Sequence, residues 1–171
     1  CTANMGQAWP KFAESVYMYD KKGILAYDDT TLSPAHKELC EVTNKGLMHG
    51  TLSDAMRGAD IFVGVSAPGV VSAEMVASMA KDPILFAMAN PTPEIEPTLA
   101  QEAGAFIVAT GRSDFDNQVN NSLAFPGLFK GVLDKNLPKI TDEMKIECAF
   151  AIASLISEEE LSPTKIIPDA L

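Results

Sequence analysis

Short, unbroken apolar runs alternate along this chain with stretches that have the spacing of amphipathic helices. The apolar runs lie at residues 16–19, 61–65, 84–88 and 106–109. Parallel strands that are covered on both faces have continuous apolar sequences, because neither side meets water. The pattern therefore predicts an α/β fold with a doubly wound, mainly parallel sheet.

Start and stop signals predict where the helices lie. Pro97 is expected in the first turn of a helix that Gly104 ends, and Thr141 is expected to cap a longer helix through about Ser157. Other helices are expected at 34–42, from Thr51 or Ser53 through Met56, from Ser72 onward and at 126–133. In the long helix one apolar stripe is expected, formed by Met144, Cys148, Ile152 and Leu155.

Composition and charge narrow the function classes. The 171 residues, 47% of them hydrophobic and 21% charged, predict a single domain or a large part of one. The net charge of −10, spread along the chain, argues against a nucleic-acid partner. No apolar run approaches the roughly 20 residues that cross a bilayer, so no membrane partner is expected. Three distant cysteines (Cys1, Cys40 and Cys148) fit a reduced cytoplasm better than a disulfide framework.

Asparagines follow two of the predicted strands. Asn90 comes just after 84–88, and the pair Asn120–Asn121 follows 106–109. Open α/β sheets bind their ligands beyond the carboxyl ends of the strands. A side-chain amide offers both a donor and an acceptor, which suits a carboxylate, a carboxamide or a ribose hydroxyl. The alternative is that these residues form turns and helix caps, which Asn also favours.

Three further features carry possible chemistry. Asp20 ends the first apolar run, where dinucleotide-binding folds place an acid that accepts hydrogen bonds from a ribose; a turn-forming Asp is the alternative. Small residues at 64–69 would let backbone amides approach a cofactor, and glycine tolerates unusual backbone angles there; an ordinary strand-to-helix turn is the alternative. Asp114 and Asp116 lack further oxygen ligands nearby in sequence, so no metal is assigned to them.

Three long motifs resemble one known family. They are GADIFVGVSAPG at 58–69, FAMANPTPEI at 86–95 and ATGRSDFDNQVNNSLAFPG at 109–127. Together they closely resemble the cofactor-binding domain of bacterial-type malic enzymes, and the likeness runs from about Val16 to the end of the chain. Members of this family oxidatively decarboxylate malate to pyruvate and carbon dioxide, reducing NAD or NADP with the help of a divalent metal.

The resemblance implies a Rossmann-like fold, the cofactor and substrate residues, a cytoplasmic location and a homodimer in the intact enzyme. Asp20 matches the ribose-binding acid, and its charge favours NAD, although Lys21 and Lys22 could offset the effect on a 2′-phosphate. The residues implied for the cofactor are Asp20, Ser66, Ala67, Asn90 and Asn120, and those implied for malate or pyruvate are Asn90 and Asn121.

The chain also departs from the family pattern. The Gly-rich turn expected before Asp20 is missing, since residues 1–15 contain Gly6 alone. The family's catalytic tyrosine and lysine, and the carboxylates that hold Mg or Mn, belong to an earlier domain that this chain does not contain. No catalytic or metal-binding residue is therefore assigned, and we expect an incomplete dinucleotide-binding domain that is inactive alone. The alternatives are a non-catalytic binding or regulatory module and the NAD domain of another dehydrogenase.

The missing first strand of such a sheet would lie centrally, between the strand that ends at Asp20 and the one at 61–65. We expect either that a strand from elsewhere fills this place or that the two neighbours pair directly. Residues 1–15 are not expected to fill it, because the segment lacks β-branched alternation and contains Pro10, which cannot join a central ladder; a regular strand at 1–9 is therefore not expected.

Overall fold

The computed structural model describes residues 12–169, which divide into two compact units. The first unit is the chain up to Ala59 together with Ser78–Ala80. The second is Asp60–Ala77 together with the chain from Lys81 onward. No helix among the described residues is long and apolar enough to cross a membrane.

The first unit contains a small antiparallel hairpin and two helices. Strands β1 (Tyr19–Asp20) and β2 (Gly23–Ile24) pair with each other, and helices α2 (Pro34–Cys40) and α3 (Leu52–Met56) follow. The helices begin where the sequence predicts. The hydroxyl of Ser33 accepts the His36 N–H at 3.2 Å, and Thr51 forms a capping box with Asp54.

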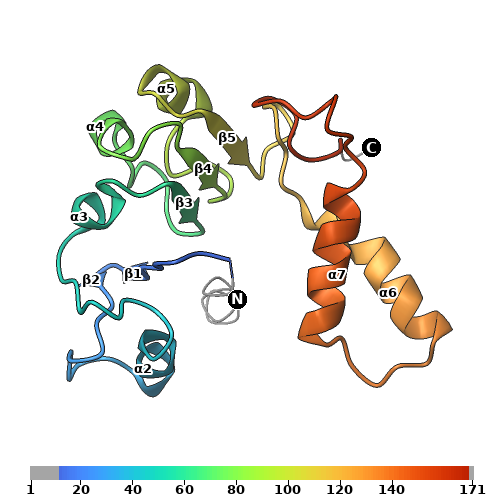
Figure 1. Ribbon diagram of the computed structural model, residues 1–171, viewed down its shortest axis with the longest axis horizontal. Helices are drawn as coiled ribbons and strands as arrows, with labels where there is room; N and C mark the ends of the chain where they lie inside the picture. Colours follow the sequence, from blue (N-terminus) through green and yellow to red (C-terminus); the bar gives the residue numbers. More distant parts are fainter. Residues whose placement is uncertain (1–11, 170–171) are drawn as a thin grey trace. The chain divides into compact units, whose positions relative to one another are not determined.

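The sheet of the second unit consists of three parallel strands in the order β3–β4–β5 (Figure 1). They are β3 (Ile61–Gly64), β4 (Ile84–Ala87) and β5 (Ile107–Thr110). In β5 the adjacent residues Val108 and Ala109 are both buried, so this strand is covered on both faces, as its unbroken apolar sequence predicts. Leu85 and Ala87 of β4 are fully buried, whereas Ile61 at the start of β3 is 49% exposed. Helices α4 (Ala73–Ala77) and α5 (Pro97–Glu102) follow β3 and β4. The predicted α/β class with a parallel sheet is confirmed.

After β5 the chain is helical, as expected. A 3₁₀ turn, η2 (Asn121–Leu123), precedes α6 (Phe125–Asp134) and α7 (Asp142–Ala153), which contact each other. Thr141 caps α7, but the helix ends at Ala153, short of the expected Ser157. The Ser154 hydroxyl donates to the Ala151 carbonyl at 2.8 Å. The next turn is held by the Glu160 carboxylate, which accepts from Ser157.

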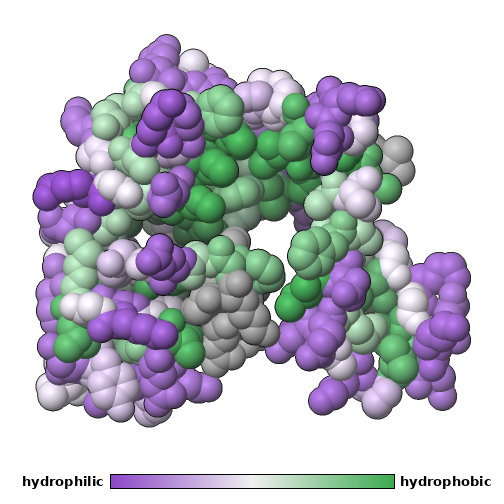
Figure 2. All heavy atoms as spheres, viewed as in Figure 1, coloured by the Kyte–Doolittle hydropathy of each residue, from purple (hydrophilic) through white to green (hydrophobic). Residues whose placement is uncertain are grey.

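The predicted apolar stripe of α7 is only partly covered. Met144, Cys148 and Ile152 are half-buried, whereas Leu155 lies beyond the helix end and is 68% exposed. Apolar residues are also open to the surface over the α6–α7 pair (Figure 2). On these elements and just after them the exposed large apolar residues are Phe125, Phe129, Leu133, Leu137, Phe150, Leu155 and Leu161.

One expectation for the region before β3 is wrong: the strand predicted at 16–19 is instead the two-residue β1. Of the two alternatives for the neighbouring strands, direct pairing of β1 with β3 is not observed among residues 12–169, and a strand from elsewhere stays a prediction. The reason is local: Gly23 adopts φ +138° and the chain reverses at once, so β2 takes the hydrogen bonds of β1. Among residues 12–169, β3 pairs only with β4. The expectation about residues 1–9 lies outside the described residues.

Candidate functional site

The carboxyl ends of β3, β4 and β5 lie at one edge of the parallel sheet. In the strand register Gly64 is opposite Ala87, which is opposite Thr110, so the three following loops begin at the same level. Ser66 and Ala67 lie in the first of these loops and Asn90 in the second. The structure therefore brings together three of the residues that the resemblance implies, at the edge where open α/β sheets bind ligands.

A buried carboxylate joins the first two loops. Glu94, in the β4–α5 loop, is 0% exposed. Its Oε1 accepts the Ser66 N–H at 2.7 Å and the Ser66 hydroxyl at 3.1 Å, and its Oε2 accepts the Ala89 N–H at 3.0 Å. Sequence analysis missed this residue. The available signal was an acid enclosed between Pro93 and Ile95 instead of lying on a polar stretch.

Backbone contacts strengthen the same connection. Val71 N–H donates to the Glu94 carbonyl at 3.1 Å, and Gly69 N–H donates to the Pro93 carbonyl at 3.4 Å. A Cβ added to Gly64 would lie 2.5 Å from Glu94 Cδ, so glycine is needed there for space. The predicted need for unusual backbone angles instead applies to Gly69, whose φ is +68°. Segments 64–71 and 89–94 are thus held together by hydrogen bonds, and we call them the linked loops.

Asn90, in the second of the linked loops, is exposed. Its backbone neighbour Ala89 is fixed by Glu94, and no described residue bonds its side-chain amide. A side chain with a held backbone and a free amide is suited to bind a planar polar group such as a carboxamide or a carboxylate.

Asn120 and Asn121 follow β5 after a loop that returns to the strand end. Val119 N–H donates to the Thr110 carbonyl at 2.7 Å. The Asn120 Oδ1 accepts the Ser122 N–H at 2.9 Å, so this side chain has the capping geometry that the alternative describes. Asn121 is exposed, and no described residue bonds its amide. Of the pair, Asn121 is thus the one whose side chain is free for a ligand.

Asn117 holds the backbone together through its side-chain amide, a role that the sequence did not indicate. It is buried, with φ +54°, and its Nδ2 donates to the carbonyls of Val108 at 3.1 Å and Pro163 at 2.8 Å. Its Oδ1 accepts the Ile166 N–H at 2.8 Å. This amide ties the C-terminal segment to β5, through partners 46 and 49 residues away.

The acidic pair after β5 does not form a metal site. Asp114 accepts two hydrogen bonds from the Arg112 guanidinium, at 2.8 and 2.5 Å, and this pairing lowers the pKa of the Asp114 carboxyl. The guanidinium also lies over the Phe115 ring, 5.2 Å from its centroid. Among residues 12–169 no three His, Cys, Asp or Glu side chains are grouped to hold a metal ion. The described residues therefore do not fit the metal that the family implies.

Asp20 belongs to the other unit and has a local role. Its Oδ1 accepts the Lys22 N–H at 2.7 Å, and its Oδ2 lies 3.9 Å from His36 Nδ1. This is the turn geometry named as the alternative, and 28% of the Asp20 side chain is exposed.

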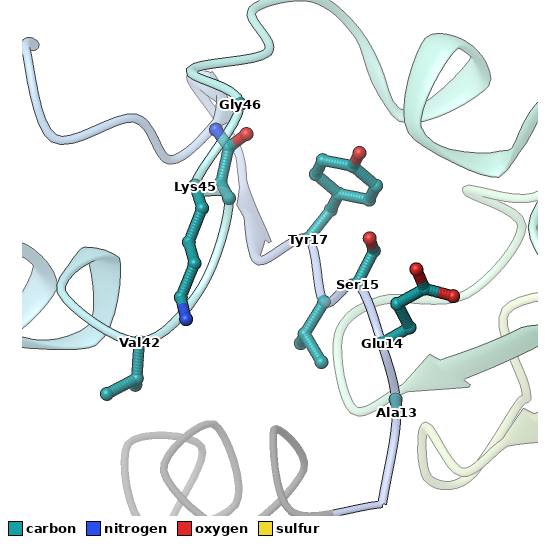
Figure 3. A pocket seen from close by; sticks show the side chains of 9 residues that line it. Ala13, Glu14, Ser15, Tyr17, Val42, Lys45 and Gly46 are labelled. Carbon is teal, nitrogen blue, oxygen red and sulfur yellow. The ribbon is translucent and has the colours of Figure 1, made fainter.

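A small pocket in the first unit lies between residues 13–17 and 42–46 (Figure 3). Asn44, which lines it, already donates to the Leu25 and Met48 carbonyls and accepts the Met48 N–H. None of the predicted site residues lines this pocket. The geometry therefore favours the sheet edge, and not this pocket, as the candidate site.

Comparison with known proteins identifies the family. A family model described as "Malic enzyme, NAD binding domain" matches residues 1–170. The chain is 51% identical to the NAD-dependent malic enzyme of Geobacillus stearothermophilus, covering 87% of this chain and 31% of the relative. It is 52% identical to the bifunctional malic/malolactic enzyme of Bacillus subtilis, covering 90% and 38%.

Solved structures agree with this assignment. The crystal structure of the NAD-dependent malic enzyme of Thermotoga maritima matches with a TM-score of 0.85 and 48% identity, covering 91% of this chain and 41% of that one. The expected Rossmann-like fold is thereby confirmed. The chain spans about a third of the length of the curated relatives named above. It belongs to the malic enzyme family and corresponds to the NAD-binding domain of those enzymes.

Proposed function

We propose that this chain is the cofactor-binding part of an enzyme that oxidatively decarboxylates malate to pyruvate and carbon dioxide while reducing NAD or NADP. One observation supports this proposal most strongly. Ser66, Ala67 and the free amide of Asn90 follow the carboxyl ends of neighbouring parallel strands, in loops that Glu94 links by hydrogen bonds. Relatives named both NAD-dependent and NADP-dependent malic enzymes support it.

The residues of this chain would bind and orient, without transferring protons. The exposed loop at Ser66 and Ala67 would contact the dinucleotide, and Asn90 would bond the nicotinamide carboxamide or the substrate. Asn121 would donate to a malate carboxylate, and Asp20 would accept from a ribose hydroxyl. Asn120 would contact the cofactor with the part of its amide that the cap leaves unused. The bound nicotinamide supplies the hydride acceptor.

The location, oligomeric state and ligands of the intact enzyme are part of the same proposal. The intact enzyme would be a cytoplasmic homodimer, would take malate and pyruvate as small-molecule ligands and would require neither nucleic acid nor a membrane. Because the described residues do not group to hold a metal, Mg or Mn would be bound by residues outside them.

The test uses the full-length polypeptide that carries this sequence, supplied with malate, manganese and either nucleotide. We expect malate-dependent nucleotide reduction with release of carbon dioxide. The purified 171-residue chain, tested in parallel, should show none. Nucleotide binding without any turnover by the full-length protein would favour the non-catalytic module. Turnover by the 171-residue chain would contradict the assignment of catalytic groups to another part of the enzyme.

A further inference from the structure

We propose that Glu94 is a positioning residue: its buried carboxylate holds the loops that carry Ser66 and Asn90 in the shape that binds dinucleotide and substrate. The inference rests on the proposed function, and it assigns a role to a residue that would touch neither ligand. Glu94 is 0% exposed, whereas Ser66 and Asn90 are exposed.

The hydrogen-bond pattern requires an acceptor at both oxygens of Glu94. Oε1 faces two donors of Ser66, and Oε2 faces the Ala89 N–H. An ionised carboxylate has acceptors only, so it satisfies all three donors. A side-chain amide would place its NH2 group against a backbone N–H donor at one of the two positions. The site therefore selects a carboxylate, and not only a polar side chain of the right size.

The contacts link segments that lie far apart in the sequence. Ser66 is 28 residues from Glu94 and follows a different strand, while Ala89 directly precedes Asn90. A local turn or cap would tie only one of these loops. Because one carboxylate group bonds both, a shift of either loop breaks hydrogen bonds of a buried charged group, which is costly. The relative placement of Ser66 and Asn90 is thus coupled through Glu94.

Gly64 completes the arrangement. The Cβ of any other residue would lie 2.5 Å from Glu94 Cδ and 2.6 Å from its Oε1. An alanine at this position would push against the carboxylate, and against the Phe62 ring 2.8 Å away, without changing Glu94 itself. Two different substitutions, Glu94→Gln and Gly64→Ala, therefore disturb the same contact from opposite sides.

The experiment measures nucleotide affinity by calorimetry and steady-state kinetics with malate, in the full-length enzyme. For Glu94→Gln we expect kcat/KM for malate to fall roughly ten- to a hundredfold and the Kd for NAD to rise, as the loss of a hydrogen bond to a charged group predicts. Glu94→Asp keeps the charge on a shorter side chain, which cannot reach both loops, so it should resemble Glu94→Gln. Glu96→Gln is the matched control, because Glu96 is exposed and its side chain makes no cap hydrogen bond.

Two results separate positioning from general destabilisation. If Glu94 acts through the loops, the double variant Gly64→Ala, Glu94→Gln should lose little more affinity than either single variant, because both remove one interaction. Amide hydrogen exchange at Ser66 and Ala89 should accelerate in Glu94→Gln and stay unchanged in Glu96→Gln.

The possible results distinguish a failure of the role of Glu94 from a failure of the proposed function. Wild-type affinity and kinetics in folded Glu94→Gln would overturn the inference and leave the proposed function standing, as would full rescue by Glu94→Asp. A wild-type enzyme that binds NAD without oxidising malate would contradict the proposed reaction, while the Kd of Glu94→Gln would still test the inference. A wild-type enzyme that binds no nucleotide would contradict both.

Discussion

Two carboxylates, Asp20 and Glu94, show how differently one chemical group is used in the two units. Asp20 accepts from Lys22, two residues away, and 28% of its side chain is exposed. Glu94 is fully buried and accepts from Ser66, 28 residues away, and from Ala89. The first bond could form in an isolated turn, whereas the second requires the folded sheet. Asp20 is therefore partly open to solvent, whereas both oxygens of Glu94 are enclosed and used by the loops of the second unit.

The largest effects are expected from substitutions of the two free side-chain amides, Asn121 after β5 and Asn90 after β4. In the full-length enzyme Asn121→Ala should lower kcat/KM for malate roughly ten- to a hundredfold, because a hydrogen bond to a charged carboxylate contributes about 1.5–3 kcal/mol. Asn90→Ala should have a similar effect, with a larger part of it in nucleotide affinity. Steady-state kinetics and calorimetry measure both. An unchanged value in a folded, nucleotide-binding Asn121→Ala variant would leave this residue with the turn role alone.

The next largest effect concerns the buried carboxylate, Glu94, and is measured as a change in the free energy of unfolding. Gly64→Ala should lower the free energy of unfolding by about 1–3 kcal/mol, because the added methyl group overlaps the Glu94 carboxylate. Gly131→Ala is the control: its Cβ would meet nothing within 4 Å, and alanine favours the interior of α6. Urea unfolding of the two variants measures the difference. Equal stability would mean that the space beside Glu94 is not needed.

Asp20→Asn tests the exposed side. The asparagine keeps the acceptor that holds the Lys22 N–H, so the free energy of unfolding should stay within about 0.5 kcal/mol of wild type. The NAD affinity of the full-length enzyme should fall roughly tenfold, since a hydrogen bond to a charged acceptor contributes about 1.5–3 kcal/mol and a neutral one contributes about half of that. Discrimination against NADP should weaken as well, because the repelling charge is gone. A variant that loses stability but keeps its affinity would show that Asp20 serves only the turn.

These two acids also mark what the sequence could predict. The strands of the sheet were predictable because burial on both faces leaves an unbroken apolar run, and caps such as Thr51 and Thr141 were predictable because their partners lie three residues ahead. The site edge followed from the strand ends. The roles of Glu94 and Asn117 were not predictable, because their hydrogen bonds span 28 and 46 residues and leave no periodic signal. The short β1 was missed because the turn at Gly23 overrides the apolar run before it.

The smallest effect concerns Asp54, a second carboxylate whose partners are local. Its Oδ2 accepts the Thr51 N–H at 2.9 Å and the Thr51 hydroxyl at 2.7 Å, and these hydrogen bonds lower the pKa of Asp54 below its ordinary value of 3.8. Because the folded-state pKa lies below the unfolded one, ionised Asp54 stabilises the chain above about pH 4, and the contribution is lost as the pH falls through the lowered pKa.

Asp54→Asn should therefore be slightly less stable than wild type near neutral pH, and the difference should narrow as the pH falls below about 4. Thermal unfolding midpoints across an acid pH series measure it. Asp60→Asn is the control, because Asp60 is exposed and none of the described side chains pairs with it, and this variant should show no such narrowing. A difference that stays constant down to about pH 2 would mean that the carboxylate charge does not stabilise the cap. Local carboxylates would then contribute through shape alone, and the contrast with Glu94 would rest on burial and not on charge.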